Sequence, residues 1–270
     1  MMKKYNIALT IAGTDPSGGA GVQADLKTFS ACGCYGTSAI TALVDQNTTG
    51  VKNVLPIPIE FVADQIASVL DDTGADAIKI GMLHSTELIK KVHQTLSKYP
   101  IKNIVLDPVM VATSGDTLLK QSAIRSLKED LIPCTRVITP NIPEAEILIG
   151  EKINNQEDLP NYAKRIAEEL TVSVLLKAGH LTDDQLVDVF YNYETQETLE
   201  LPSQRLYTPN THGTGCTLSS ALASFLAKGY SLNDAVIQAK NYIAEALIAG
   251  AQYQVGKGHG PVHHFYAFWK

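Results

Sequence analysis

Short apolar runs alternate with amphipathic segments along almost the whole 270-residue chain. Runs rich in β-branched residues predict buried strands, and apolar positions spaced by three and four predict helices. Strands are expected at residues 6–12, 37–44, 77–80, 103–106, 137–139 and 172–176. Helices are expected at residues 22–31, 61–70, 86–96, 122–131, 162–170, 218–227 and 232–248. This alternation predicts an α/β fold in which helices cover a parallel sheet.

Two later segments depart from the alternation. Residues 186–191 and 198–201 have strand character and flank a polar turn at 192–196. We expect them to pair antiparallel at the edge of the sheet. The sequence contains no internal repeat or linker, and α/β folds of this length often remain single units, so one domain is expected over residues 1–270.

The composition narrows the possible partners. The chain has 22 Lys and Arg against 28 Asp and Glu, a net charge of −6, and no basic cluster, which argues against nucleic acid as its main partner. No apolar run is long enough to span a membrane and no cleavage signal follows the basic start, so we expect a cytoplasmic location without a membrane partner. The four cysteines lack the spacing of a zinc site, so free thiols are expected.

A glycine-punctuated loop leads into the helix expected at 218–227, and its sequence is Thr211-His212-Gly213-Thr214-Gly215-Cys216-Thr217. The first turn of a helix has backbone amides without partners and the positive end of the helix dipole, so the glycines would let an anion approach closely. The same amides would favour a thiolate at Cys216. Two glycines alone would indicate an ordinary turn. With the cysteine, they suggest phosphate chemistry beside a proton acceptor.

Polar residues follow several predicted strands at the point where each strand ends. Parallel strands share their carboxyl ends, so these residues are expected at one edge of the sheet, where ligands bind in open α/β folds. Asp107 ends an apolar strand and is either a buried structural carboxylate or a charge aimed at a cation or substrate. Lys177 ends another, and we favour a phosphate over an ion pair as its partner.

Three further positions have both structural and functional interpretations. Asp25 follows the glycine-rich loop at 13–21, whose spacing misses the dinucleotide-binding pattern, and it either faces the ligand crevice or solvates its helix. Gln46 could pair with a ring nitrogen and an exocyclic amine, although a solvated loop glutamine is the simpler explanation. Asn141 and Glu144 have the spacing of a capping box, which is compatible with Mg²⁺ binding through water.

Taken together, these motifs resemble the hydroxymethylpyrimidine and phosphomethylpyrimidine kinases of thiamine synthesis, a branch of the ribokinase-like superfamily. The resemblance covers nearly the whole chain. It rests on residues 12–21, 46–48, 79–82, 107–110, 139–144, 177–180, 211–216 and 256–265. Several motifs in the right order make it specific.

The resemblance implies a three-layer α/β/α fold, a homodimer, and the use of ATP and Mg²⁺ to phosphorylate a small pyrimidine. Matching positions imply an anion hole formed by residues 211–216, with Gly213, Thr214, Gly215 and Cys216 as the catalytic group. They imply a pyrimidine pocket lined by Gly13, Asp25, Gln46, Met82 and Val109. They assign Lys177, Asn141 and Thr211 to the nucleotide, and Asp107 and Glu144 to the metal.

Three alternatives remain open at this point. A related branch phosphorylates pyridoxal with much the same motifs. Cys216 could instead be the nucleophile of an acyl-transfer enzyme, with His212 or His180 as its base. A nucleotide sensor would bind nucleotide without turnover.

Overall fold

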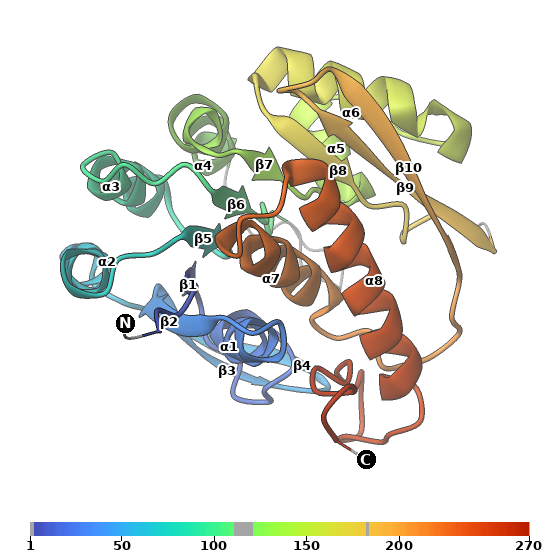
Figure 1. The fold of residues 1–270 in the computed structure, drawn as a ribbon, viewed down its shortest axis with the longest axis horizontal. Helices are drawn as coiled ribbons and strands as arrows, with labels where there is room; N and C mark the ends of the chain where they lie inside the picture. The colour runs from blue at the N-terminus through green and yellow to red at the C-terminus, as the bar shows by residue number, and fades with distance from the viewer. Residues whose placement is uncertain (1–2, 111–120, 182–183, 270) are drawn as a thin grey trace.

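An eight-stranded sheet forms the centre of the computed structural model, which describes residues 3–110, 121–181 and 184–269 (Figure 1). The strand order is β10-β9-β8-β7-β6-β5-β1-β2. The strands are β1 (Ile7–Ala12), β2 (Tyr35–Ile40), β5 (Ala77–Ile80), β6 (Ile104–Leu106), β7 (Val137–Ile138), β8 (Ser173–Leu176), β9 (Gln185–Asn192) and β10 (Glu197–Gln204). Six of these strands, β2, β1, β5, β6, β7 and β8, pair in parallel, and β9 and β10 add antiparallel at the edge, as predicted.

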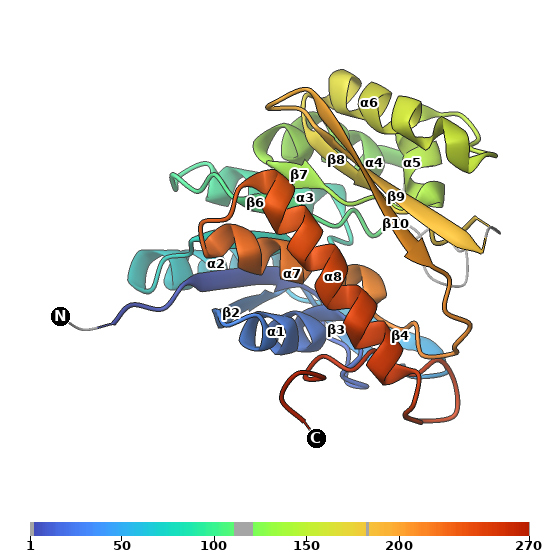
Figure 2. The ribbon, with the colours of Figure 1, turned by 45° about the vertical axis from the view of Figure 1, so that its right-hand side comes forward.

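Helices cover both faces of this sheet, and the two views in Figures 1 and 2 show the resulting three layers. One face packs against α1 (Gly21–Ala31), α7 (Thr214–Ala227) and α8 (Leu232–Gly250). The other packs against α2 (Ile59–Asp72), α3 (Thr86–Leu96), α4 (Gln121–Ser126), α5 (Ile142–Ile149) and α6 (Leu159–Leu170). Short turns of other helix types occupy Leu127–Leu131, Ile132–Cys134 and Gln156–Asp158. The predicted α/β/α architecture is confirmed.

Side chains along each strand alternate between these two layers. In β5, Ala77 belongs to the apolar cluster on the α7 face, and Ile78 and Ile80 belong to the cluster on the opposite face. The same alternation directs the polar or charged residue at or near the end of five strands toward α7. These residues are Thr10, Lys79, Asp107, Thr139 and Lys177. A row of polar groups therefore lies between the sheet and the start of α7.

The single strand predicted at residues 37–44 is wrong, because the chain leaves the main sheet at Thr41. There the Thr41 amide donates to the Ala12 carbonyl oxygen at 2.9 Å, and its hydroxyl donates to the Met82 carbonyl oxygen at 2.9 Å. Beyond this anchor, β3 (Ala42–Asn47) pairs with β4 (Gly50–Pro56) in a separate two-stranded sheet. The sequence does not reveal this break, because the residues before and after Thr41 form one continuous apolar run.

Within the described residues, none of the helices combines the length and the hydropathy that a membrane span requires.

Candidate functional site

The glycine-punctuated loop runs directly into a helix, as predicted. This helix, α7, begins at Thr214, within the predicted loop and before the predicted start at 218. Its N-cap is Gly213, which has a φ of 76° in the left-handed region that favours glycine. No side chain of the described protein caps this end, and its first turn contains no acidic residue. The amides of the first turn thus face the carboxyl edge of the sheet with the positive end of the helix dipole. This is the geometry of an anion site.

Asp107 and Lys177 border this turn from the ends of β6 and β8. The Lys177 Nζ atom lies 3.2 Å from the Asp107 Oδ1 atom, so the ion pair considered for Lys177 is present. Around Gly215 there is little free space: a Cβ atom there would lie 3.4 Å from the Lys177 Nζ atom and 3.5 Å from an Asp107 oxygen. Burial lowers the pKa of Lys177, but Asp107 and Glu144 outweigh it and raise the pKa overall. A permanent positive charge therefore borders the anion site.

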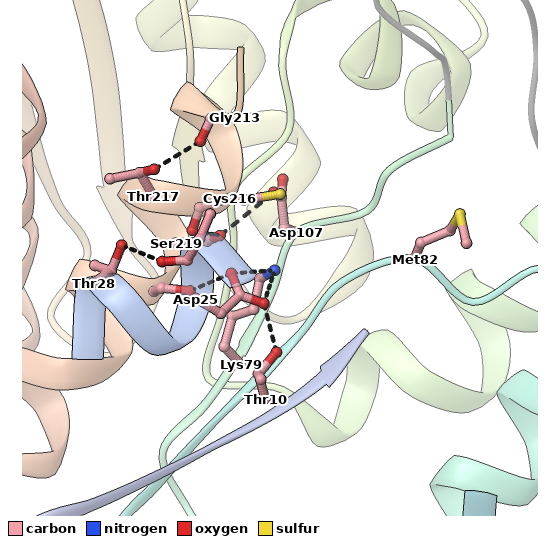
Figure 3. Close-up of polar contacts among 12 residues, drawn as sticks. Thr10, Asp25, Thr28, Lys79, Met82, Asp107, Gly213, Cys216, Thr217 and Ser219 are labelled. Carbon is pink, nitrogen blue, oxygen red and sulfur yellow. Dashed lines mark hydrogen bonds and ion pairs between the residues drawn. The ribbon is translucent and has the colours of Figure 1, made fainter. Parts of the chain in front are cut away.

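Cys216 lies in the same turn, beside Asp107 (Figure 3). Burial raises the pKa of its thiol to about 11, and the nearby charge of Lys79 offsets this only in part. The prediction that the helix amides favour a thiolate at Cys216 is therefore wrong, because desolvation outweighs them. At neutral pH this cysteine is a thiol.

Asn141 and Glu144 form the predicted capping box at the start of α5. The Glu144 amide donates to the Asn141 side chain at 3.0 Å, and the Asn141 amide donates to the Glu144 Oε2 atom at 2.9 Å. The other Glu144 oxygen accepts from the Met110 amide at 3.2 Å, so this carboxylate also ties the loop after β6 to α5. Burial raises the pKa of Glu144, and Lys177 counteracts that increase.

The carboxylate oxygens of Asp107 and Glu144 suit Mg²⁺. Among the described residues there is no cluster of three or more His, Cys, Asp or Glu side chains able to hold a metal. Mg²⁺ in phosphoryl-transfer sites usually takes only one or two carboxylates, and water and substrate phosphates complete its shell. Asp107 fits this requirement well, because its partners Thr139 and Ser219 donate to it over long distances of 3.3 and 3.4 Å.

The residues assigned to the substrate pocket are only partly brought together. Gly13 and Met82 lie side by side, since a Cβ atom on Gly13 would be 2.8 Å from the Met82 terminal carbon. Met82 is set to one side of the Cys216 cluster (Figure 3). Gln46 stands on the β3–β4 hairpin rather than at the tip of a strand of the main sheet. Val109 follows Asp107 with a φ of 42°, a strained conformation for a β-branched residue that often accompanies functional sites.

Asp25 does not line a pocket. Its side chain is fully buried, and Lys79 contacts both of its oxygens at 2.9 Å. The Thr10 hydroxyl donates to it at 2.6 Å (Figure 3), and so does the Ser220 hydroxyl, also at 2.6 Å. The assignment of Asp25 to the substrate is therefore corrected: all the contacts of this carboxylate lie between the sheet and α7.

Sequence reasoning missed the pairing of Asp15 with His212, which joins the first loop to the anion loop. The His212 Nε2 atom lies 2.7 Å from an Asp15 oxygen and 3.4 Å from the Gln46 Nε2 atom. Burial alone would raise the pKa of Asp15, but hydrogen bonds from His212, Ser17 and the Ala20 amide lower it to about 2. No local pattern indicated this contact across 197 residues. In the described structure the hydrogen bonds of the His212 ring go to Asp15 and Gln46, and none joins it to Cys216 as an acyl-transfer base would require.

Comparison with known proteins identifies the family. The profile described as phosphomethylpyrimidine kinase matches residues 15–263. The chain belongs to the phosphomethylpyrimidine kinase family. It is 48% identical to the hydroxymethylpyrimidine/phosphomethylpyrimidine kinase of Escherichia coli (strain K12), over 99% of this chain and 100% of that protein. It is therefore a kinase of the ribokinase-like fold.

Two solved structures are also similar. A phosphomethylpyrimidine kinase from Clostridium difficile 630 has 44% sequence identity and a TM-score of 0.79, with 89% of this chain and 98% of that chain covered. A Bacillus subtilis pyridoxal kinase solved as an ADP complex has 38% identity and a TM-score of 0.89, with 98% and 99% covered. The backbone alone thus does not separate pyrimidine kinases from pyridoxal kinases, and substrate choice depends on side chains.

Gly213→Ala should disable the site because its new Cβ atom would overlap the Gly19 carbonyl oxygen and push the two loops apart. We expect kcat/KM to fall at least about tenfold, since a displacement of 1 Å can cost roughly 10²-fold. Gly229→Ala is the matched control, because Gly229 has a φ of 83° at the other end of α7 and nothing within 4 Å of its Cβ position. Steady-state kinetics and urea unfolding of both variants would measure this. Equal kinetics in the two variants would contradict the role of the Gly19 contact.

Proposed function

We propose that this kinase uses ATP to phosphorylate 4-amino-5-hydroxymethyl-2-methylpyrimidine and then phosphorylates the monophosphate to the diphosphate, in thiamine biosynthesis. The observation that carries the proposal is the uncapped first turn of α7, with Cys216 in it and the Lys177 and Asp107 side chains beside it. Relatives with up to 48% identity bear the name of this two-step kinase. We also propose a cytoplasmic location, where the four cysteines would stay in the free form in which they occur, and one kinase domain over residues 1–270.

Phosphoryl transfer depends on positioning and on neutralising charge more than on covalent chemistry of the protein. In the proposed mechanism, the amides of Gly213, Thr214, Gly215 and Cys216 donate to the transferred phosphoryl group. Lys177, Asn141 and Thr211 hold the nucleotide, with the Lys177 ammonium placed to pair with its phosphates. Asp107 and Glu144 would hold Mg²⁺, which would neutralise negative charge on the ATP phosphates.

Gln46 is proposed to recognise the aminopyrimidine edge, with Gly13, Met82 and Val109 packing around the ring. An amide side chain offers one acceptor and two donors, which match a ring nitrogen and an exocyclic amine. Gln46 is partly buried, and its side-chain amide lies beside His212 of the anion loop.

Cys216 is proposed to accept the proton of the substrate hydroxymethyl group. With a pKa of about 11, only about one thiol in 10,000 is ionised at pH 7. The ionised form increases as the pH rises toward that value, so a step that uses it should become faster. The second phosphorylation differs, because its acceptor is a phosphate oxygen with a second pKa of about 6 and needs no base.

A homodimer is proposed through the outer face of the β3–β4 hairpin. Leu43 and Leu55 are cross-strand partners on this face, and their exposed fractions are 44% and 61%. A second copy of the chain would cover this apolar surface.

Leu43→Lys with Leu55→Lys should give a monomer, because two charges on each copy would oppose each other across the contact. Sedimentation equilibrium measures the mass. Phe268→Lys is the control, since Phe268 is 64% exposed elsewhere on the chain and its replacement should leave a dimer. A wild-type protein that sediments as a monomer would exclude the proposed dimer.

Cys216→Ala should reduce the first phosphorylation roughly 10²-fold or more, the usual contribution of a general base, and change the second by less than about threefold. The wild-type first step should accelerate with pH between 7 and 9, whereas the variant and the second step should not. A coupled ATP assay on hydroxymethylpyrimidine, its monophosphate and pyridoxal measures these rates.

Equal losses in both steps would count against the base role of Cys216 but leave the kinase function intact. The function itself fails if the wild-type enzyme transfers phosphate to neither pyrimidine. Pyridoxal as the preferred acceptor would favour the related branch.

Gln46→Leu should raise the KM for hydroxymethylpyrimidine at least about tenfold, since a polar group of the bound ring then loses its partner. The KM for ATP is the internal control and should remain the same. An unchanged pyrimidine KM would remove Gln46 from the pocket.

A further inference from the structure

Lys79 and Asp25 form a buried ion pair that the proposed mechanism does not use. Lys79 is the third residue of β5, a strand whose four residues are all buried, and neither side chain of the pair has any exposed surface. Replacing a buried ion pair by apolar residues of similar volume is often neutral or stabilising. Stability alone therefore does not account for a lysine at this place in the sheet.

The pair is attached to α7 on one side and to the sheet on the other. The Ser220 hydroxyl, on α7, donates to the Asp25 Oδ1 atom at 2.6 Å, and the Thr10 hydroxyl, on β1, donates to the Oδ2 atom at 2.6 Å. Ser220 follows Cys216 by four residues, so the two side chains lie one turn apart on the same face of the helix. Asp25 thus contacts the helix one turn behind the residue that meets the reacting groups.

Lys79 directs its charge toward the same turn. A Cβ atom on Gly81, at the carboxyl end of β5, would lie only 2.9 Å from the Lys79 Nζ atom, so the ammonium reaches the level of the strand end. Burial lowers the pKa of Lys79, but Asp25 outweighs it, and Cys216 and Asp107 add to the increase, so the amine remains protonated. Figure 3 shows the Asp25–Lys79 pair below Cys216 and Asp107.

We propose that Lys79 is a positioning residue for phosphoryl transfer: held by Asp25, it fixes the register of α7 against the sheet and places a buried positive charge behind the anion loop. Lys79 touches neither substrate in this proposal and acts through Ser220, Cys216 and the amides of the first turn of α7. The inference rests on the proposed kinase function, because it assigns the anion loop to the transferred phosphoryl group.

The two hydroxyls that bind Asp25 provide a matched pair of variants. Ser220→Ala and Thr10→Val each remove one 2.6 Å hydrogen bond to the same carboxylate, from α7 and from β1 respectively. We expect similar shifts of the urea midpoint, but a kcat for hydroxymethylpyrimidine at least about tenfold lower in Ser220→Ala and within about twofold of wild type in Thr10→Val. The KM for ATP should change less than about threefold in both.

The charge is tested by the double variant Lys79→Met with Asp25→Asn, since the asparagine oxygen can accept from one of the two hydroxyls and its NH₂ group can donate to the other. We expect a folded protein with a kcat at least about tenfold below wild type. A double variant with wild-type kcat overturns the proposal, and so does equal kcat in Ser220→Ala and Thr10→Val. If the double variant does not fold, the comparison of these two single variants decides alone.

The wild-type protein separates this inference from the proposed function. If it phosphorylates neither pyrimidine, the proposed function fails. If it turns over normally and the variants behave alike, only the role of Lys79 fails.

Discussion

The backbone amides at the start of α7 lack a side-chain cap, and this missing cap explains much of the arrangement of the site. Uncapped amides at a helix end normally bind water or a capping side chain, and the start of α5 shows the usual solution in Asn141 and Glu144. At α7 the N-cap is a glycine, and no acidic side chain lies in the first turn. The chain thus leaves its donors and the helix dipole available to an anion that must come and go with each turnover.

Charged groups near this helix end are costly to bury, and the fold pairs them in a consistent way. Lys177 is held by Asp107, and the fully buried Lys79 is held by Asp25, so both of these ammonium groups have a carboxylate partner. Strand alternation puts both lysines on the α7 face. This pairing keeps the net charge around the helix end low, which limits the desolvation cost of folding.

The sequence predicts those parts of the fold that depend on local patterns. Most strands with apolar runs and the capping box at Asn141 and Glu144 appear where they were expected, whereas the helix expected at 218–227 begins earlier, at Thr214. Lys79 was overlooked although it gives the same signal as Lys177, a lysine at or beside the end of an apolar strand. The break at Thr41, the burial of Asp25 and its contact with Ser220 depend on contacts between distant segments, so no local pattern could reveal them.

The raised pKa of Cys216 follows from the same tertiary burial, and it bears on how one site could serve two acceptors. A thiolate fixed beside the anion loop would repel an incoming phosphate monoester, which carries about two negative charges at neutral pH. A neutral thiol imposes no such penalty, and the small fraction that has lost its proton to solvent is a strong base toward the alcohol. In this turn burial disfavours the thiolate more strongly than the helix amides favour it, so Cys216 is uncharged at neutral pH. Under the proposed function, that neutrality is what makes the site compatible with both the alcohol and the phosphate acceptor.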